Sequence, residues 1–207
     1  MADQPRTLTV TTPDRVPMAY VGLARAFRGR IEAAVTVAIK IVRDTSQQLI
    51  ARQRRHPVQR RDTLASIARA WRDKVPAFGR ANQEIRLEGK EADWDEDARE
   101  PGLSVVRITP AIAPHEKLAL GMHMLCAASL HALARRYQRG RPTTDDAIIA
   151  DLHALAAAHE RLRGLPEGDG FAVDVASGQW LGNALDVRSH YSGRVERVPN
   201  VRTFVET

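Results

Sequence analysis

Apolar residues three and four positions apart predict one long helix in the N-terminal quarter of the chain. The spacing holds for about four heptads between about Met18 and about Arg55, as in the seam of a helix that packs on another helix. The seam positions are Tyr20, Ala24, Phe27, Ile31, Ala34, Ala38, Ile41, Thr45 and Leu49. His56-Pro57 ends the pattern, because the residue before a proline disfavours the helical backbone. We expect the seam to face the core of the same chain or, alternatively, a partner subunit or a second copy.

Two further helical patterns lie in the second half of the chain and provide the expected core. One covers 112–137, is rich in Leu, Met and Ala, and ends in arginines, where positive charge favours a helix end. The other covers 144–163 and follows the capping residue Thr143. A few residues join the two, so we expect an antiparallel helical hairpin on which the long helix packs. A shorter helix is expected over about 62–75.

Alternating and β-branched segments predict strands outside these helices. Thr7–Thr12 is typical of a short N-terminal strand. Segments 83–88 and 103–109 are expected to pair as a hairpin around the acidic loop 88–102. The C-terminal strands are expected at 171–175, 194–198 and 201–205, with turn signals at Ser177-Gly178, Gly182-Asn183 and Ser192-Gly193.

Together these patterns predict an α+β protein that is predominantly α-helical. It would have a long N-terminal helix, a helical hairpin core and small β elements at both termini. We expect a helical core domain at 1–167, including the N-terminal strand and the acidic loop 88–102, and a small β-rich C-terminal appendage at 168–207. Aromatic residues make up 5% of the chain, which also favours helices, because large sheets draw on aromatic and β-branched residues.

Cysteine content and hydropathy indicate the cellular compartment in which we expect the protein. The single cysteine, Cys126, cannot form an intramolecular disulfide, which fits a reducing environment. The N-terminal residues lack the apolar core of a secretion signal, and no run of about 18 apolar residues occurs. We therefore expect a cytoplasmic protein that does not span a membrane.

Positive charge is concentrated between Arg25 and Arg61. This stretch has ten basic and two acidic residues, a net charge of +8, whereas the whole chain has +6 and the remainder therefore −2. Clustered arginines bind phosphate oxygens and displace the counterions of a nucleic acid. We expect the exposed face of the long helix and its exit turn to bind a nucleic-acid backbone through Arg25, Arg28, Lys40, Arg43, Arg52, Arg54, Arg55, Arg60 and Arg61. The alternatives are binding to an acidic protein surface, or a solvated face that only keeps the protein soluble.

Candidate catalytic or metal chemistry is weak. His123 and Cys126 lie three apart on an expected helix, like half of a metal site, but no second pair follows at ligand spacing. Asp93, Asp95 and Asp97 in the acidic loop lack the glycine and closing glutamate of a calcium loop. Glycine-rich phosphate-binding loops and the serine-nucleophile motif are absent from the sequence. We therefore expect structural histidines, no cofactor and no metal.

The sequence thus favours a non-catalytic subunit that binds the backbone of RNA or DNA within a larger nucleoprotein assembly. The small subunit of a CRISPR-type effector complex and an accessory protein of a mobile element are analogies of size, charge and helicity only. A structural protein of a virion or a secretion machine, acting through protein contacts along the long helix, is the second hypothesis. A helical enzyme that uses the histidines is the third.

Overall fold

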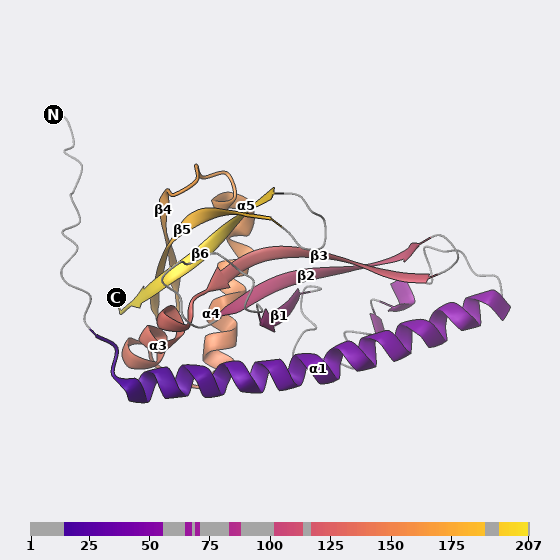
Figure 1. Cartoon of the computed structure of the whole chain (residues 1–207), viewed down its shortest axis with the longest axis horizontal. Helices are drawn as coiled ribbons and strands as arrows, with labels where there is room; N and C mark the ends of the chain where they lie inside the picture. Colours follow the sequence, from indigo (N-terminus) through magenta and orange to yellow (C-terminus); the bar gives the residue numbers. More distant parts are fainter. Residues whose placement is uncertain are drawn as a thin grey trace.

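The computed structural model describes a long helix that lies along one side of a mixed β-sheet (Figure 1). The described residues are 15–55, 65–67, 69–70, 83–87, 102–113, 117–188 and 195–206. The helices are α1 (Met18–Arg55), α3 (Leu130–Arg139), α4 (Asp145–Ala157) and α5 (His159–Leu162). The strands are β1 (Gln83–Leu87), β2 (Leu103–Ala113), β3 (Lys117–Ala128), β4 (Gly170–Val175), β5 (Gly178–Arg188) and β6 (Val195–Val205).

The sheet has six strands in the order β1-β2-β3-β6-β5-β4. Neighbouring strands are antiparallel except for β3 and β6, which are parallel and pair only at Ala127 with Asn200 and at Ala128 with Val201. Beyond this short contact β2 and β3 continue together, away from the other strands and towards the C-terminal end of α1 (Figure 1).

The sequence prediction of a helical hairpin core with small terminal β elements is wrong. The sheet is a main layer of the fold, and five of its strands lie between Leu103 and Val205. The segment 112–137, expected to be one helix, forms the end of β2, strand β3 and most of α3. Leu, Met and Ala favour helices, yet Leu118, Leu120, Met122 and Met124 also alternate with a period of two, which suits a strand paired along its length with β2. Tertiary pairing therefore overrides local propensity here.

Several local predictions are confirmed. The long helix spans Met18–Arg55, and 83–87 pairs with 103–107 as a hairpin. Helix α4 lies within the predicted 144–163, but its capping side chain is Thr144, which accepts from the Ala147 amide at 3.3 Å, rather than Thr143. Residues 65–67 and 69–70 of the expected short helix are helical. The expected strand Thr7–Thr12 lies outside the described residues. The acidic loop 88–102 also lies outside them, except for its last residue, Gly102.

The C-terminal strands differ from the prediction at two points. The expected strands 194–198 and 201–205 are one continuous strand, β6. The predicted turn at Gly182-Asn183 lies inside β5, at an irregularity between Leu181 and Gly182. A Cβ at Gly182 would lie 2.1 Å from the Asn200 carbonyl oxygen, so glycine permits the close approach of β5 and β6.

Helix α3 lies at the centre of the hydrophobic core, in contact with both α1 and β6. On one side, the rings of Phe27 and Tyr137 meet edge to face with centroids 6.3 Å apart. On the other, Trp180 and Phe204 are buried together with centroids 4.8 Å apart. One apolar cluster thus includes residues of α1, α3, α4 and the sheet. The position of α1 therefore depends on the position of α3.

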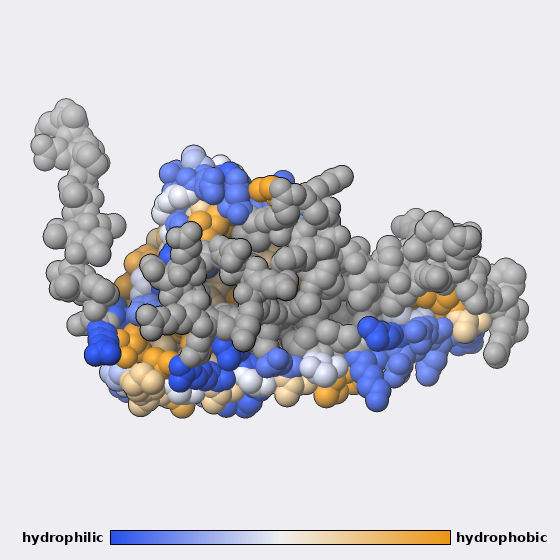
Figure 2. All heavy atoms as spheres, in the orientation of Figure 1, coloured by the Kyte–Doolittle hydropathy of each residue, from blue (hydrophilic) through white to orange (hydrophobic). Residues whose placement is uncertain are grey.

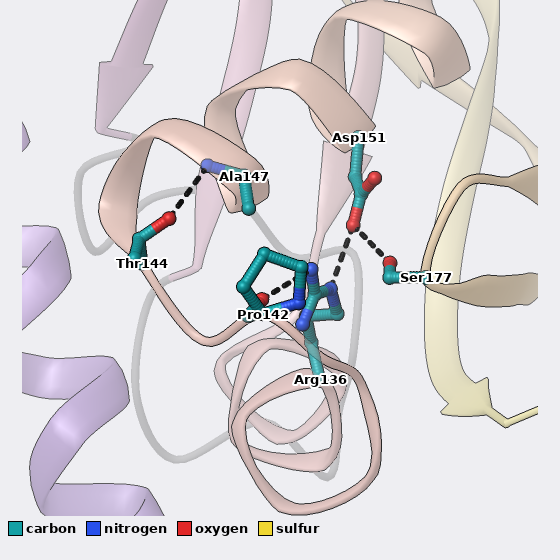
Figure 3. Close-up of polar contacts among 6 residues, drawn as sticks. All are labelled: Arg136, Pro142, Thr144, Ala147, Asp151 and Ser177. Atoms are coloured by element: carbon teal, nitrogen blue, oxygen red, sulfur yellow. Dashed lines mark hydrogen bonds and ion pairs between the residues drawn. The ribbon is translucent and has the colours of Figure 1, made fainter.

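A buried ion pair fixes α3 against α4 (Figure 3). The Arg136 side chain is fully buried, and its Nε donates to Asp151 Oδ2 at 2.6 Å. The same carboxylate oxygen accepts from Ser177 Oγ at 2.6 Å, and Arg136 Nη2 donates to the Pro142 carbonyl at 3.0 Å. The guanidinium also stacks over the Phe204 ring at 5.3 Å. The Arg136–Asp151 pair thereby joins α3, α4, β6 and the turn between β4 and β5.

Space for the Arg136 side chain requires a glycine after α3. A Cβ at Gly140 would lie 2.4 Å from Arg136 Nη1. Gly140 is also the C-cap of α3, with its amide donating to the Arg136 carbonyl at 2.9 Å. The end of α3 and its buried arginine are therefore packed as one unit.

Substitution of Asp151 by alanine is expected to destabilise the protein by about 3–5 kcal/mol, because it leaves the Arg136 charge buried without its carboxylate. Urea unfolding followed by circular dichroism measures the change. The matched control is Asp146→Ala on the exposed first turn of the same helix, with an expected loss below about 1 kcal/mol. Equal losses in the two variants would contradict a stabilising role for the buried pair.

Candidate nucleic-acid interface

The proximal half of α1 is held against the protein by apolar packing. Ala24 and Phe27 of the predicted seam are fully buried, and Tyr20 and Ile31 pack against the same cluster. The contacts of α1 are mainly with α3 and with strands β1 and β3. The seam therefore faces the chain's own core, although much of what it meets is sheet rather than the predicted helical hairpin.

The distal half of α1 also has an inward side. Thr45 of the predicted seam is buried, and Ser46 and Ile50, which lie outside the seam, are buried too. Ala34, a seam position, is exposed. The buried side thus shifts around the helix between its two halves, as expected where a straight helix departs from a 3.5-residue repeat.

An ion pair adds to the attachment of α1 near its middle. Arg30 Nε and Nη2 donate to the two carboxylate oxygens of Asp145, each at 2.7 Å. Asp145 begins α4 and also accepts from the Tyr137 hydroxyl at 3.2 Å. The hydrogen bonds that Arg30 donates to the Asp145 carboxylate lower the pKa of Asp145 and raise the pKa of Arg30. Burial, with the Asp145 charge as a further cause, raises the pKa of Tyr137 to about 12. Arg30 is therefore engaged within the protein.

The structure describes the side chains of five of the nine predicted phosphate-binding residues. Arg25, Lys40, Arg43 and Arg52 are exposed on α1, and Arg28 is half-buried. Arg25 and Arg28 each have an interaction partner in the protein. Arg54 and Arg55 are the last residues of α1, but their side chains are not described, and Arg60 and Arg61 lie outside the described residues.

Exposed basic residues gather on the distal half of α1. Lys40, Arg43 and Arg52 span 12 residues, or about 18 Å along the helix axis. Gln47 and Gln48 are exposed between them, and Asp44 is the acidic residue of this half. Figure 2 shows the corresponding surface in blue towards the right-hand end of α1. The arrangement offers an elongated polar surface with net positive charge.

The sequence offers His123 and Cys126 only as a weak half of a metal site, and the structure does not place them on one helical face. His123 and Cys126 lie on strand β3, not on a helix; His123 is exposed and Cys126 is fully buried. His123 Nδ1 lies 4.0 Å from Glu196 Oε1. Burial raises the pKa of the Cys126 thiol, which disfavours the reactive thiolate. Within the described part of the chain, no three His, Cys, Asp or Glu side chains gather where they could hold a metal ion.

His159 has a structural contact. Its Nδ1 lies 2.7 Å from the Leu125 carbonyl oxygen, so the ring links α5 to β3. Burial lowers the pKa of His159 and of His153, which favours their neutral forms in the folded protein. This contact joins residues 34 positions apart in the sequence, and no local pattern predicts it.

The sequence also did not predict which arginines form ion pairs within the protein. No sequence feature distinguishes Arg30 and Arg136 from the nearby arginines, yet each binds a carboxylate on α4. Asp145 and Asp151 are six positions apart, so they lie on different sides of that helix, and the sequence does not show which arginine meets each of them.

Comparison of the chain with protein-family models, with curated proteins and with solved structures gives no match. Among the described residues, no helix has the length and apolar character needed to cross a bilayer.

A double-mutant cycle of Arg30→Ala and Asp145→Ala is expected to give a coupling of about 0.5–1 kcal/mol at neutral pH, because the pair is bidentate but solvent-exposed. The pKa of Asp145 is lower in the folded than in the unfolded protein. The contribution of the ion pair to the free energy of unfolding is therefore fully present above the ordinary aspartate pKa, and it is lost as the pH falls through the lowered pKa of the folded protein. Unfolding free energies across this pH range measure it.

The control pair is Glu160 and Arg163, which are exposed and three positions apart, with Arg163 Nε 3.2 Å from Glu160 Oε2. Its coupling is expected to be about 0.3 kcal/mol. A coupling for Arg30 and Asp145 no larger than this would show that the pair adds little to the attachment of α1.

Proposed function

We propose that the protein is a non-catalytic subunit that binds the phosphate backbone of a nucleic acid through the distal half of α1. The observation that supports the proposal is the exposure of Lys40, Arg43 and Arg52 on a helix whose proximal half is fixed to the core. Arg54 and Arg55 follow directly in the sequence. A helix that is packed on its inward side along both halves presents its exposed cations without the cost of ordering a flexible segment.

Backbone binding fits the chemistry of these side chains better than base recognition. Lysine and arginine neutralise phosphates and release counterions, which gives affinity for any sequence. Specific readout requires side chains that reach base edges in a groove, usually from a motif with a defined docking geometry. Lys40 and Arg43 lie about 4.5 Å apart along the helix axis and about 60° apart around it, so they would meet neighbouring phosphates. Arg52 lies about 13.5 Å further along and on the opposite side from Arg43, so it would meet a separate phosphate.

Arg25 and Arg28 are expected to contribute less than the distal residues. Both have partners within the protein, and Arg28 is half-buried. Arg30 is left out of the proposed surface because its Nε and Nη2 donate to the Asp145 carboxylate. Binding is therefore centred on the C-terminal part of the basic stretch.

The triple variant Lys40→Glu, Arg43→Glu and Arg52→Glu is expected to bind generic oligonucleotides at least tenfold more weakly at low salt. The slope of log K against log salt should fall by about one for each phosphate contact that is lost, and the loss should be the same for unrelated sequences. Fluorescence anisotropy with single- and double-stranded probes over a salt series measures both quantities.

A second triple variant with the same change in net charge is the control. It replaces three exposed arginines from the C-terminal half of the sequence by glutamate, namely Arg141, Arg161 and Arg163. This variant should keep most of the affinity for oligonucleotides. Equal losses in the two variants would mean that binding follows net charge only. No binding of any probe by the unmodified protein at low salt would refute the proposal.

A further inference from the structure

The exposed side of the distal half of α1 has a cation at each of its two margins. Successive residues turn by about 100° around a helix, so Arg43 and Arg52, nine positions apart, lie on opposite sides of the axis. Lys40 lies about 60° from Arg43 and about 120° from Arg52, so it is on the side of Arg43. Thr45 and Ser46 are buried on the inward half of the helix between these margins. Positive charge therefore faces outwards in two directions.

The stretch of α1 between Arg43 and Arg52 contains no further cation. Its exposed residues are Asp44, Gln47, Gln48 and Ala51. They lie on the outward side, in the middle between the two margins. A single strand that ran from one arginine to the other would cross this middle and pass the Asp44 carboxylate, which repels phosphate. The two margins therefore suit two separate lines of phosphates.

Two lines of phosphates border the major groove of a B-form duplex. That groove is about 12 Å wide, and an α-helix with its side chains is about 10–12 Å across. A helix in the groove would direct Lys40 and Arg43 to one strand and Arg52 to the other, with the middle of its exposed side facing the base edges. We propose that the nucleic acid is double-stranded DNA and that the distal half of α1 lies in its major groove. The proposal rests on the phosphate binding proposed above and names the class of nucleic acid that the same surface binds.

The polar residues in the middle of this side suit the floor of the groove. Every base pair presents both donors and acceptors there, and the amides of Gln47 and Gln48 donate as well as accept. Asp44 can accept from the amino groups of cytosine and adenine. Ala51 has a short side chain that allows the helix to approach closely. These contacts do not require one base sequence, so the phosphates still supply most of the affinity.

Other forms of nucleic acid fit this surface less well. The minor groove of B-form DNA is about 6 Å wide, which is narrower than a helix. The major groove of an RNA duplex is deep and narrow, so side chains do not reach its floor. Proteins that bind single strands usually stack the bases on aromatic side chains, and residues 40–52 include none.

The position of α1 leaves the surface open to a rod-shaped partner. Figures 1 and 2 show α1 along the lower edge of the molecule, with the hydrophilic surface towards its right-hand end. Lys40 to Arg52 cover about 18 Å of helix, which corresponds to about five base pairs. So few phosphate contacts give modest affinity that falls steeply with salt, and binding is therefore measured at low salt.

Competition among three probes of one sequence tests the class of nucleic acid. The probes are a DNA duplex of about 15 base pairs, its separate strands and the corresponding RNA duplex, compared with the full chain at equal phosphate concentration by fluorescence anisotropy. The DNA duplex is expected to bind at least tenfold more tightly than the other two. Equal binding of the strands or of the RNA duplex would overturn docking in the groove and leave phosphate binding in place. No binding of any probe would overturn both.

Single charge reversals test whether both margins of the helix are used. Arg43→Glu and Arg52→Glu are each expected to weaken binding of the DNA duplex about fivefold at low salt, whereas the control Arg161→Glu, on α5, should change it less than about twofold. Unchanged circular dichroism shows that each variant is folded. A loss in only one of the two α1 variants would contradict contact with both strands.

Dimethyl sulfate tests which groove is occupied, because it methylates guanine N7, which lies in the major groove. The reaction is expected to be slower in a short DNA duplex saturated with the protein than in the free duplex. The Arg43→Glu and Arg52→Glu variants, at the same concentration, should protect the guanines less. Unchanged methylation in a duplex that anisotropy shows to be bound would overturn docking in the major groove.

Discussion

The buried ion pair between Arg136 and Asp151 is the interaction on which the arrangement of layers depends. A buried charge is tolerated only with a close partner, and here the partner comes from a different helix. The pair fixes α3 against α4, and the cation–π contact with Phe204 fixes α3 against β6. Because α1 packs on α3 through Phe27 and Tyr137, the direction of the long helix follows from this pair.

The outer surface of α1 changes in character along its length, although the helix itself is continuous. Its inward side is apolar near Ala24 and Phe27 and includes Thr45 and Ser46 further on. Its outward side up to Val37 mixes exposed apolar residues with Arg25, Arg30 and Glu32, and it is polar and basic from Lys40 onwards. The position of Arg30 explains part of this division, since the cation nearest the middle of the apolar surface is paired with Asp145.

The elements predicted correctly are those whose signals are local. The long helix has a sustained repeat and a proline after its end, and the pairing of β1 with β2 follows from two β-branched segments around an acidic loop. Strand β3 was mistaken for a helix because Leu, Met and Ala suit both structures, and the choice is made by pairing with β2. Strand β5 was missed because Gly182 was interpreted as a turn, whereas it permits a close approach to β6.

The candidate site was predictable in outline only. A concentration of charge is visible in the sequence, but the partners of its members are not. Arg30 and Asp145 are 115 residues apart, and their contact exists only because α3 brings α1 and α4 together.

Hydrogen exchange of the full chain, with and without a short oligonucleotide at low salt, most directly tests whether the distal half of α1 is the binding surface. Added protection is predicted for peptides that cover residues 40–55, with little change in α4 and in strands β4 to β6. Protection confined to the C-terminal strands, with none in α1, would contradict the assignment.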